Sequence, residues 1–342
     1  MNALRDIITA EARAHGAMTF ARFMELALYT PALGYYEREL KQIGKRGDFF
    51  TSVSVGPLFG ELLAFQFARW AEANDAGSFQ IVEAGAHDAQ LACDILEAME
   101  RHDPAIFARL EYWIIEPSVR RHAVQQQTLA RFSNVRWFEN LAELRGRVNG
   151  VMFSNELFDA MPVHVFRWNA ARHHWDEMGV TVGDSGFVVT ALAEPSVQPM
   201  KLPDELLHVL PDGYTVEISP AANRWWSDAA DALVRGKLMT IDYGGVLEEL
   251  LNPGRTRGTL RAFSNHRISD NILTAPGEQD ITAHVNFTEL RVTGERAGLK
   301  TESFTTQSQF LTGIARHLWE RRGSWPATQV RQFQTLTHPE HL

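Results

Sequence analysis

The chain has 342 residues, of which 45% are hydrophobic and 22% are charged, and its formal net charge is −9. A chain of this length can bury a substantial core, and its composition is that of a globular enzyme. The acidic balance, without a basic run or a basic helical face, argues against a nucleic-acid partner. The single cysteine, Cys93, excludes an internal disulfide and fits a reducing compartment. Because no apolar run approaches the roughly 18 residues of a membrane span and no signal peptide is evident, we expect a cytoplasmic protein without a membrane span.

The first 75 residues are predicted to be mainly helical. Apolar residues recur at helical spacing in MNALRDIITAEARAHG and again in FARFMELALY, where Thr19 is placed to be the N-cap. A glycine-punctuated, aromatic loop, LGYYERELKQIGKRGDFFTS, separates these helices from a strongly apolar one in GPLFGELLAFQFARW. The helical region therefore precedes the first strand.

Strand and helix patterns alternate from about residue 79 onwards. A helix fits between each successive pair of predicted strands, which cover residues 79–84, 112–115, 135–138 and 151–154. A fifth strand, KLMTIDYG, follows a predicted helix, PAANRWWSDAADALVRG. This alternation predicts an α/β fold with a parallel, Rossmann-like sheet, right-handed crossovers and helices on both faces.

Two segments interrupt the alternation. Residues 163–217 repeat with period two, which predicts antiparallel hairpins; their Phe166, Trp168 and Trp175 fit either a homodimer interface or a packed face. Residues 246–285 are rich in glycine and proline and predict a loop-rich excursion, after which a helix, a strand (LKTESFT) and a helix complete the chain. We expect a single α/β domain over residues 1–342. It begins with a helical region and a loop that closes over a cofactor (1–75). The core sheet (76–162 and 214–245) is interrupted by the hairpin insertion (163–213) and is followed by the excursion (246–287) and the C-terminal part of the core (288–342).

Polar groups follow four of the predicted strands at the point where each strand ends. The segments are Glu83 to Asp88, Glu116 to Ser118, Ser154 to Glu156, and Asp242 to Gly244. Ligands of open parallel sheets bind beyond these carboxyl ends, near the point where the strand order reverses. An acid that recurs at strand ends therefore predicts a binding site there, although any single one could be a solvated or capping group.

The turn in IVEAGAHDAQLACDIL is typical of a nucleotide-type cofactor site. A dinucleotide would require the glycines of G-x-G-x-x-G, but this turn has His87 and Ala89, and Glu116 lies further from Gly85 than the roughly 20 residues of that fingerprint. S-adenosylmethionine has no phosphates, so one glycine can suffice. A carboxylate at Glu116 is suited to accept hydrogen bonds from ribose hydroxyls. The pattern favours S-adenosylmethionine over a dinucleotide.

Several blocks of the sequence resemble a known family in the same order. They are MTFARFMELALYTPALGYY, GDFFTS, FGELLA, VEAGAHDAQLACDIL, SNELFDAMPV, EISPAANRWW, TIDYGG and RGTLRAFSNHRISDNILTAPGEQDITAHVNFTEL. The ordered set resembles the MidA-type family of S-adenosylmethionine-dependent methyltransferases, which includes the mitochondrial arginine methyltransferase that assists assembly of respiratory complex I. The resemblance implies a class I methyltransferase sheet and, as partner, a protein substrate such as a respiratory-complex subunit.

The resemblance also assigns residues to the cofactor. It implies Glu83 and Gly85 against the methionyl part, Glu116 on the ribose, and Gly47, Asp48 and Phe49 closing over the cofactor. Many members have a glycine-richer turn than residues 85–89, and a Pro-Glu-Ile-Ser-like run where this chain has VSVG after GDFFTS. His87 fits either a polar cap over the cofactor or a side chain packed locally, and Asp88 is expected to cap the helix that follows.

The acceptor site is predicted in SNELFDAMP. Glu156 and Asp159 would lie on one face of a helical turn, and the family motif lies on the same residues. Asn155 could add a contact to the acceptor and is also expected to bind the cofactor. Carboxylates can orient an arginine guanidinium and leave one nitrogen to attack, although an acid pair that caps the turn is the alternative. His284 could take the proton that the acceptor loses, or could anchor the excursion loop. No Cys/His set has metal-ligand spacing, so no metal is expected.

These patterns leave three functions open. The first is an S-adenosylmethionine-dependent protein methyltransferase that acts on arginine. The second is a non-catalytic assembly factor that kept the fold while its cofactor site degenerated, which His87 and Ala89 would favour. The third, a nicotinamide oxidoreductase, lacks the required glycines.

Overall fold

The computed structural model describes residues 3–38, 51–74, 77–264, 267–269 and 271–338. Unit 1 comprises Met1–Glu39, Leu157–Trp226 and Asp242–Thr293, and unit 2 comprises Leu40–Glu156, Ser227–Ile241 and Gly294–Leu342. Each unit is therefore assembled from stretches that lie far apart in the sequence. The single-domain description of the chain stays a prediction.

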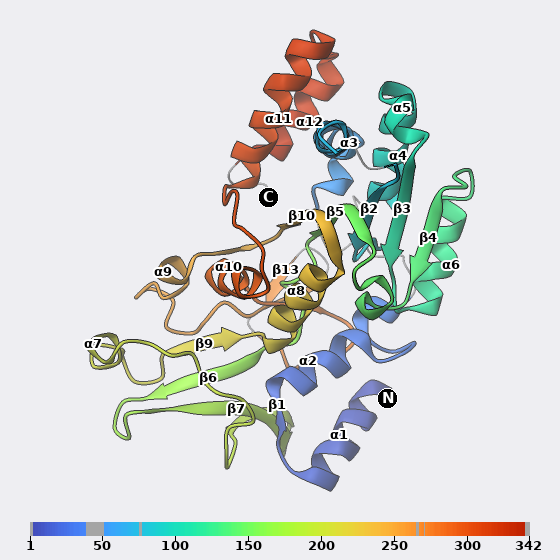
Figure 1. The fold of residues 1–342 in the computed structure, drawn as a ribbon. Helices are drawn as coiled ribbons and strands as arrows, with labels where there is room; N and C mark the ends of the chain where they lie inside the picture. The colour runs from blue at the N-terminus through green and yellow to red at the C-terminus, as the bar shows by residue number, and fades with distance from the viewer. Residues whose placement is uncertain (1–2, 39–50, 75–76, 265–266, 270, 339–342) are drawn as a thin grey trace. The chain divides into compact units, whose positions relative to one another are not determined.

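Unit 2 contains the five-stranded parallel sheet (Figure 1). Its strand order is β10 (Leu233–Ile241), β5 (Val148–Asn155), β2 (Phe79–Ala84), β3 (Leu110–Ile115) and β4 (Val135–Phe138). The chain leaves β2 toward β3 and β4 on one side and continues with β5 on the other side. The strand order therefore reverses at β2, and a ligand site is expected beyond the carboxyl ends of β2 and β5.

Helices cover this sheet because its strands are hydrophobic on both faces. Those of unit 2 are α3 (Leu58–Glu72), α4 (Gln90–His102), α5 (Pro104–Phe107), α6 (Val119–Thr128), α11 (Gln307–Arg322) and α12 (Ala327–Leu336), with a 3₁₀ turn at Val53–Val55. Phe67 of α3 and Ile95 of α4 belong to one buried cluster with Ile81, Tyr112 and Phe153 of the strands. The face of β2 that bears Ile81 is thus closed off from water.

The predicted parallel strands and the α/β class are confirmed, with two corrections in unit 2. Only a 3₁₀ turn, Leu141–Leu144, forms between β4 and β5, where a helix was predicted, because Asn140 and Glu143 close a capping box around a single turn. The strand predicted in LKTESFT does not form. Leu299 is half-buried and residues 300–305 are exposed, Phe304 by 53%, so no buried face supports a strand. The final helix, α12, was not predicted.

Unit 1 contains an antiparallel sheet, as the period-two pattern predicted. Its strands are β1 (Met18–Thr19), β6 (His164–Asn169), β7 (His174–Gly183), β8 (Gly186–Ala191) and β9 (Thr215–Ile218). β9 lies where the predicted hairpin stretch (163–217) and the predicted core-sheet segment (214–245) overlap, and it pairs antiparallel with β6. Tyr214 and Val216 pack there against the buried rings of Phe166 and Trp168. Since Trp175 is also buried, these aromatic residues form a packed face of unit 1 and not a surface open to a second copy. The homodimer stays a prediction without their support.

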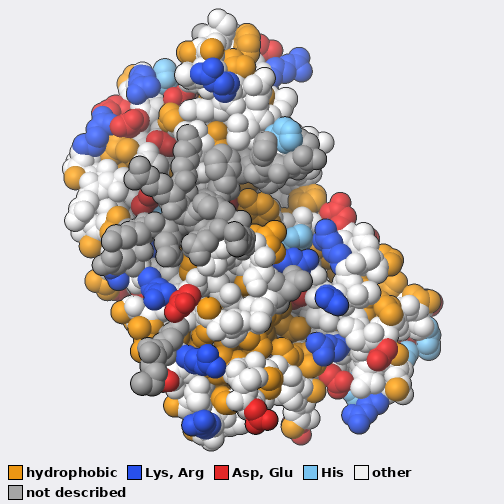
Figure 2. Space-filling view, turned by 180° about the vertical axis from the view of Figure 1, so that it is seen from behind, with side chains coloured by type: hydrophobic (Ala, Val, Ile, Leu, Met, Phe, Trp, Pro, Cys, Tyr) orange, Lys and Arg blue, Asp and Glu red, His pale blue; other side chains and the backbone are white. Residues whose placement is uncertain are grey.

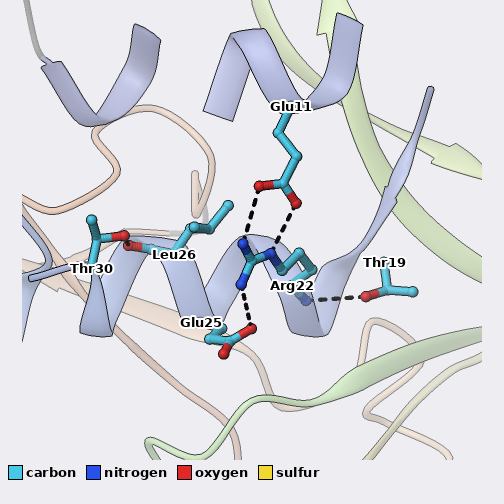
Figure 3. Close-up of polar contacts among 6 residues, drawn as sticks. All are labelled: Glu11, Thr19, Arg22, Glu25, Leu26 and Thr30. Carbon is cyan, nitrogen blue, oxygen red and sulfur yellow. Dashed lines mark hydrogen bonds and ion pairs between the residues drawn. The ribbon is translucent and has the colours of Figure 1, made fainter. Parts of the chain in front are cut away.

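Helices α1 (Ala3–His15) and α2 (Phe20–Tyr29) also belong to unit 1 and are joined by a charged clamp (Figure 3). The guanidinium of Arg22 donates to both carboxylate oxygens of Glu11, at 2.9 and 3.1 Å, and to Glu25 at 2.9 Å. The hydrogen bond from Arg22 lowers the pKa of Glu11. The predicted N-cap is confirmed, since the hydroxyl of Thr19 accepts a hydrogen bond from the backbone N–H of Arg22.

The excursion contains short elements between loops. They are β11 (Gly244–Gly245), α9 (Leu247–Leu250), β12 (Arg261–Ser264), β13 (Arg267–Ser269), β14 (Asp280–Thr282) and β15 (Val285–Asn286), in addition to the 3₁₀ turn Tyr35–Glu37 and α7 (Asp204–Leu207) elsewhere in unit 1. Helices α8 (Pro220–Ala232) and α10 (Phe287–Arg296) begin in unit 1 and end in unit 2. Trp225 and Trp226 pack edge-on against Phe158.

Two properties of the described residues concern partners. No helix among them is both long and apolar enough to cross a bilayer. On the coloured part of the surface in Figure 2, Lys and Arg side chains are interspersed with acidic and uncharged ones.

Candidate functional site

Three strands of unit 2 end in register at one edge of the parallel sheet. Ala84, at the end of β2, lies opposite Ile115 of β3 on one side and opposite Ser154 of β5 on the other. The residues that follow these three are Gly85, Glu116 and Asn155. The structure thus brings together three of the predicted cofactor residues, which lie up to 70 positions apart in the printed sequence.

The turn after β2 has a left-handed backbone at three of its five residues. The φ angles are 76° at Gly85, 49° at His87 and 63° at Ala89. A Cβ disfavours this region by about 1–2 kcal/mol, so the last two positions are ones that glycine would fill without strain. The glycine-poor turn therefore keeps a backbone shape that suits glycine, and strain of this kind concentrates at binding sites.

The turn also begins helix α4. Asp88 was predicted to be its N-cap, but the cap position is Ala89, and the side chain of Ala89 has no oxygen with which to bond the helix. A carboxylate oxygen of Asp88 instead accepts from the N–H of Gln90 at 3.1 Å, as in an Asx turn. His87 is half-buried, 3.5 Å from Asp88 through its Nδ1, and burial lowers the pKa of His87. Whether this ring caps the cofactor or only packs locally stays a prediction.

Glu83 is a buried acid on the face of β2 that packs against α3 and α4. Alternation along the strand places it with Phe79 and Ile81, and only 3% of it is exposed. Burial raises the pKa of Glu83 to about 7, opposed by the hydroxyl of Tyr112, which donates to Oε2 at 2.6 Å. The charged form of a buried carboxylate is stabilised when a cationic group binds next to it.

Glu116 follows β3 and is also buried. Its Oε1 accepts from the backbone N–H of Ser118 at 2.9 Å, and its Oε2 accepts from the side-chain amide of Gln125 at 2.7 Å. A carboxylate can accept about four hydrogen bonds, so these two are compatible with further bonds from ribose hydroxyls.

Gln125, on α6, was missed by the sequence analysis. It is fully buried, and its Nε2 donates both to Glu116 and, at 3.0 Å, to the backbone oxygen of His87. Its Oε1 accepts from the indole N–H of Trp137 at 3.0 Å. The sequence carries little signal for this role, because Gln125 is the first of three consecutive glutamines and the structure buries this one alone within α6.

Asn155 ends β5 and has an acceptor without a partner. Its Oδ1 is buried and receives no hydrogen bond from the described residues, while its Nδ2 donates to Glu156 at 3.3 Å. A buried amide oxygen left in this state costs free energy unless a ligand or water satisfies it. Glu156 itself has φ 51°, a strained value for a residue other than glycine.

Asp159 and Asp242 lie in unit 1. Asp242, which the sequence analysis noted without a role, accepts from the N–H groups of Leu157 and Phe158 at 3.0 and 2.8 Å and so fixes the backbone before Asp159. Burial raises the pKa of Asp242 to about 6, opposed by these N–H groups. Asp159 is buried. The pKa of the Tyr36 hydroxyl is raised by the burial of Tyr36 itself and, in addition, by the nearby Asp280, Tyr29 and Asp159. Asp159 therefore lies close enough to Tyr36 to influence its hydroxyl.

His284 belongs to the same unit. Its neighbour Ala283 donates its N–H to the backbone oxygen of Asp159 at 2.9 Å, so the structure brings these two segments together. Burial and the guanidinium groups of Arg255 and Arg261 lower the pKa of His284. A neutral imidazole is able to accept a proton.

The remaining predicted residues are distributed as follows. Glu83, Gly85, His87, Glu116 and Asn155 all belong to unit 2, as does Glu156, whereas Asp159 and His284 belong to unit 1. Gly47, Asp48 and Phe49 lie outside the described residues. The pairing of Glu156 with Asp159 stays a prediction from their spacing in the sequence.

Comparison with known families identifies one that matches most of the chain. Residues 62–305 match the family described as "Putative S-adenosyl-L-methionine-dependent methyltransferase". The matched residues contain both Glu83 and Glu116 at the strand ends, and SNELFDAMP as well.

Known structures and curated proteins are similar over most of the chain. A crystal structure of a Burkholderia thailandensis protein bound to S-adenosyl-homocysteine has a TM-score of 0.83 and 31% identity, covering 98% of this chain and 88% of that chain. A second structure from that organism has a TM-score of 0.80 with the same identity and coverage. The rat mitochondrial protein arginine methyltransferase NDUFAF7 is 29% identical over 81% of this chain. This chain spans 66% of the length of the rat protein.

Proposed function

Because the chain belongs to this family of S-adenosyl-L-methionine-dependent methyltransferases, we propose that it transfers a methyl group from S-adenosylmethionine to an arginine of a protein partner. The observation that carries the cofactor side is the register of β2, β3 and β5, whose ends bring Gly85, Glu116 and Asn155 together. The arginine side is supported by the named activity of the distant rat relative and by the acids of SNELFDAMP.

The residues at the sheet edge fit the chemistry of this cofactor. The buried Oδ1 of Asn155 has an unused acceptor capacity that a bound ligand would satisfy. Glu116 would accept from the ribose hydroxyls, and Glu83 would accept from the ammonium of the methionyl part. Both are buried acids, where a charge-assisted hydrogen bond is worth about 1.5–3 kcal/mol. The cofactor, when bound, supplies a methyl group on a positively charged sulfur that is open to displacement.

The acceptor must be held so that a nitrogen lone pair is available. A guanidinium is a poor nucleophile because its charge is delocalised, and a carboxylate that accepts from two of its N–H groups concentrates that charge away from the attacking nitrogen. Glu156 is the proposed carboxylate, and its positive φ at a strand end is the kind of strain that functional sites retain. Asp159 is proposed as its second acid on the sequence spacing alone.

The acceptor nitrogen gains the methyl group and loses one proton. His284 is proposed as the proton acceptor, because the nearby Arg255 and Arg261 and its burial keep its imidazole neutral. A cytoplasmic location and a respiratory-complex subunit as partner remain proposals that rest on the sequence and on the family resemblance.

Transfer of labelled methyl groups tests the proposal. The purified protein is given labelled S-adenosylmethionine and an extract of cells that lack this protein, and the methylated residue is identified by mass spectrometry. Glu156→Gln keeps the volume of the side chain but removes the charge that holds the guanidinium. We expect transfer to fall about 100-fold, consistent with about 3 kcal/mol of charge-assisted positioning, while affinity for S-adenosyl-homocysteine is retained.

The matched control is Glu194→Gln, which removes an exposed carboxylate of a loop and should leave transfer unchanged. Transfer by Glu156→Gln at the parent rate would exclude Glu156 from the acceptor site. Labelling of residues other than arginine would exclude the acceptor class. If the parent binds S-adenosyl-homocysteine and labels no protein, the non-catalytic assembly factor becomes the better explanation.

A further inference from the structure

We propose that Gln125 is a positioning residue of the cofactor site, which acts through Glu116 and the turn at His87 to select ligands that carry a ribose diol. This inference rests on the proposed function, since it assumes that Glu116 binds the ribose. No part of it follows from the sequence blocks that carry the family resemblance, because Gln125 lies outside all of them.

The first observation is the burial of an amide where a helix normally buries a hydrocarbon side chain. Gln125 is the only buried residue of α6, all of whose residues the structure describes, and it is fully enclosed. Gln126 and Gln127 follow it on the exposed side of the same helix. A buried amide is tolerated only where its hydrogen bonds are satisfied, so this position is specified by its partners.

The second observation is that the partners fix the direction of the amide. The indole N–H of Trp137 is a donor only, and it meets the side-chain oxygen of Gln125 at 3.0 Å. A flipped amide would set donor against donor, so Trp137 keeps the NH₂ group of Gln125 turned toward Glu116 and His87.

The third observation is what the two N–H groups hold. One donates to Oε2 of Glu116 at 2.7 Å, while the N–H of Ser118 takes Oε1 at 2.9 Å, so the carboxylate is gripped at both oxygens and cannot rotate. The other donates to the backbone oxygen of His87, whose φ of 49° is strained. The side chain of Gln125 therefore positions both Glu116, the proposed ribose-binding residue, and the turn that follows β2.

A locked carboxylate discriminates between ligands that differ by one hydroxyl. With Glu116 held, a ligand that lacks the 2′-hydroxyl loses a charge-assisted hydrogen bond to a fixed carboxylate, which disfavours the deoxy ligand by about tenfold or more. Without Gln125, Glu116 can turn toward another partner or toward water, and the penalty for the missing hydroxyl decreases. The expected signature is a loss of discrimination and not merely a loss of affinity.

The test measures the affinities of the full-length protein for S-adenosyl-homocysteine and for its 2′-deoxy analogue by calorimetry. The parent should prefer the first by about tenfold or more. Gln125→Leu keeps the volume of the side chain but removes the amide. In this variant the ratio of the two affinities should fall to within about twofold of one, because the tighter binding of S-adenosyl-homocysteine is lost. Gln126→Leu is the matched control on the exposed face and should keep the parent ratio.

A merely structural role predicts a different result, because weaker folding would lower both affinities equally. An unchanged ratio in Gln125→Leu therefore overturns the proposal, whatever happens to its thermal stability. Should Gln125→Leu not fold, Trp137→Phe keeps an aromatic ring but removes the N–H that orients the amide, and an unchanged ratio there overturns the proposal equally. If the parent binds neither ligand at millimolar concentration, the proposed function itself fails, which is a separate and recognisable outcome.

Discussion

Replacing Glu83 by glutamine is expected to make the protein more stable and at the same time a poorer binder of S-adenosylmethionine. The substitution keeps the shape of the side chain and an oxygen that can accept from the hydroxyl of Tyr112, which now lies at 2.6 Å. It removes a negative charge that burial disfavours in the free protein. Stability and binding should therefore change in opposite directions.

The pKa of Glu83 gives the size of the stability change. Burial raises it from 4.5 to about 7. Below pH 4.5 the carboxyl is protonated in both the folded and the unfolded chain. As the pH rises to about 7, the folded chain retains a proton that the unfolded chain releases, so its stability decreases. Since each pKa unit corresponds to about 1.4 kcal/mol, Glu83→Gln should gain up to roughly 3 kcal/mol over the parent at pH 8 and almost nothing at pH 4.5.

Binding should show the opposite dependence. The charged carboxylate is the proposed acceptor for the ammonium of the methionyl part, so Glu83→Gln should weaken S-adenosyl-homocysteine by at least about tenfold at pH 8. In the parent, affinity should fall about tenfold between pH 8 and pH 6 as Glu83 becomes protonated, and the variant should lack this dependence.

Urea unfolding and calorimetric titration at several pH values measure both effects. The matched control is Asp94→Asn, because Asp94 is also buried in unit 2 and its pKa is also raised by burial, to about 6. That variant should gain stability with rising pH and keep the parent affinity. If Glu83→Gln binds as tightly as the parent at pH 8, Glu83 does not contact the cofactor. If its stability follows that of the parent at every pH, Glu83 is not a costly buried charge.

Four other substitutions test the site and its surroundings. Gly85→Val should weaken binding by about tenfold or more in the same titration, because a branched side chain is strained by about 1–2 kcal/mol or more at φ 76°. Ala89→Gly should be tolerated, since relief of the φ of 63° offsets the loss of a buried methyl. Equal binding by Gly85→Val would remove this turn from the site. Glu116→Ala should weaken S-adenosyl-homocysteine by at least about tenfold in a protein whose circular dichroism is unchanged, and unchanged affinity would contradict its role on the ribose. Asp242→Ala should lower the free energy of unfolding by about 1–3 kcal/mol, because the N–H groups of the segment before Asp159 lose their acceptor, and a smaller change in urea unfolding would argue against that anchoring.

Local patterns determined much of this fold. Short, mainly hydrophobic runs between helical segments predicted the strands 79–84 and 135–138 with their observed bounds. The same patterns located the acids at the strand ends and the cap at Thr19. They failed where a short segment depended on its surroundings. Residues 299–305 have no buried face in the structure, and the strand predicted in LKTESFT is absent.

Only the tertiary structure decided which polar residues act together. The sequence identified Glu116 as an acid after a strand, but the amide that grips it comes from the next helix and is itself oriented by Trp137 of a further strand. No spacing rule joins these positions, because their contact depends on how α6 packs against the parallel sheet. Likewise the turn at residues 85–89 lacks the glycines expected of it, yet its backbone takes the left-handed angles that glycine favours at His87 and Ala89. Sequence determines which groups are available, and packing selects the one glutamine of three whose hydrogen bonds are made in the interior.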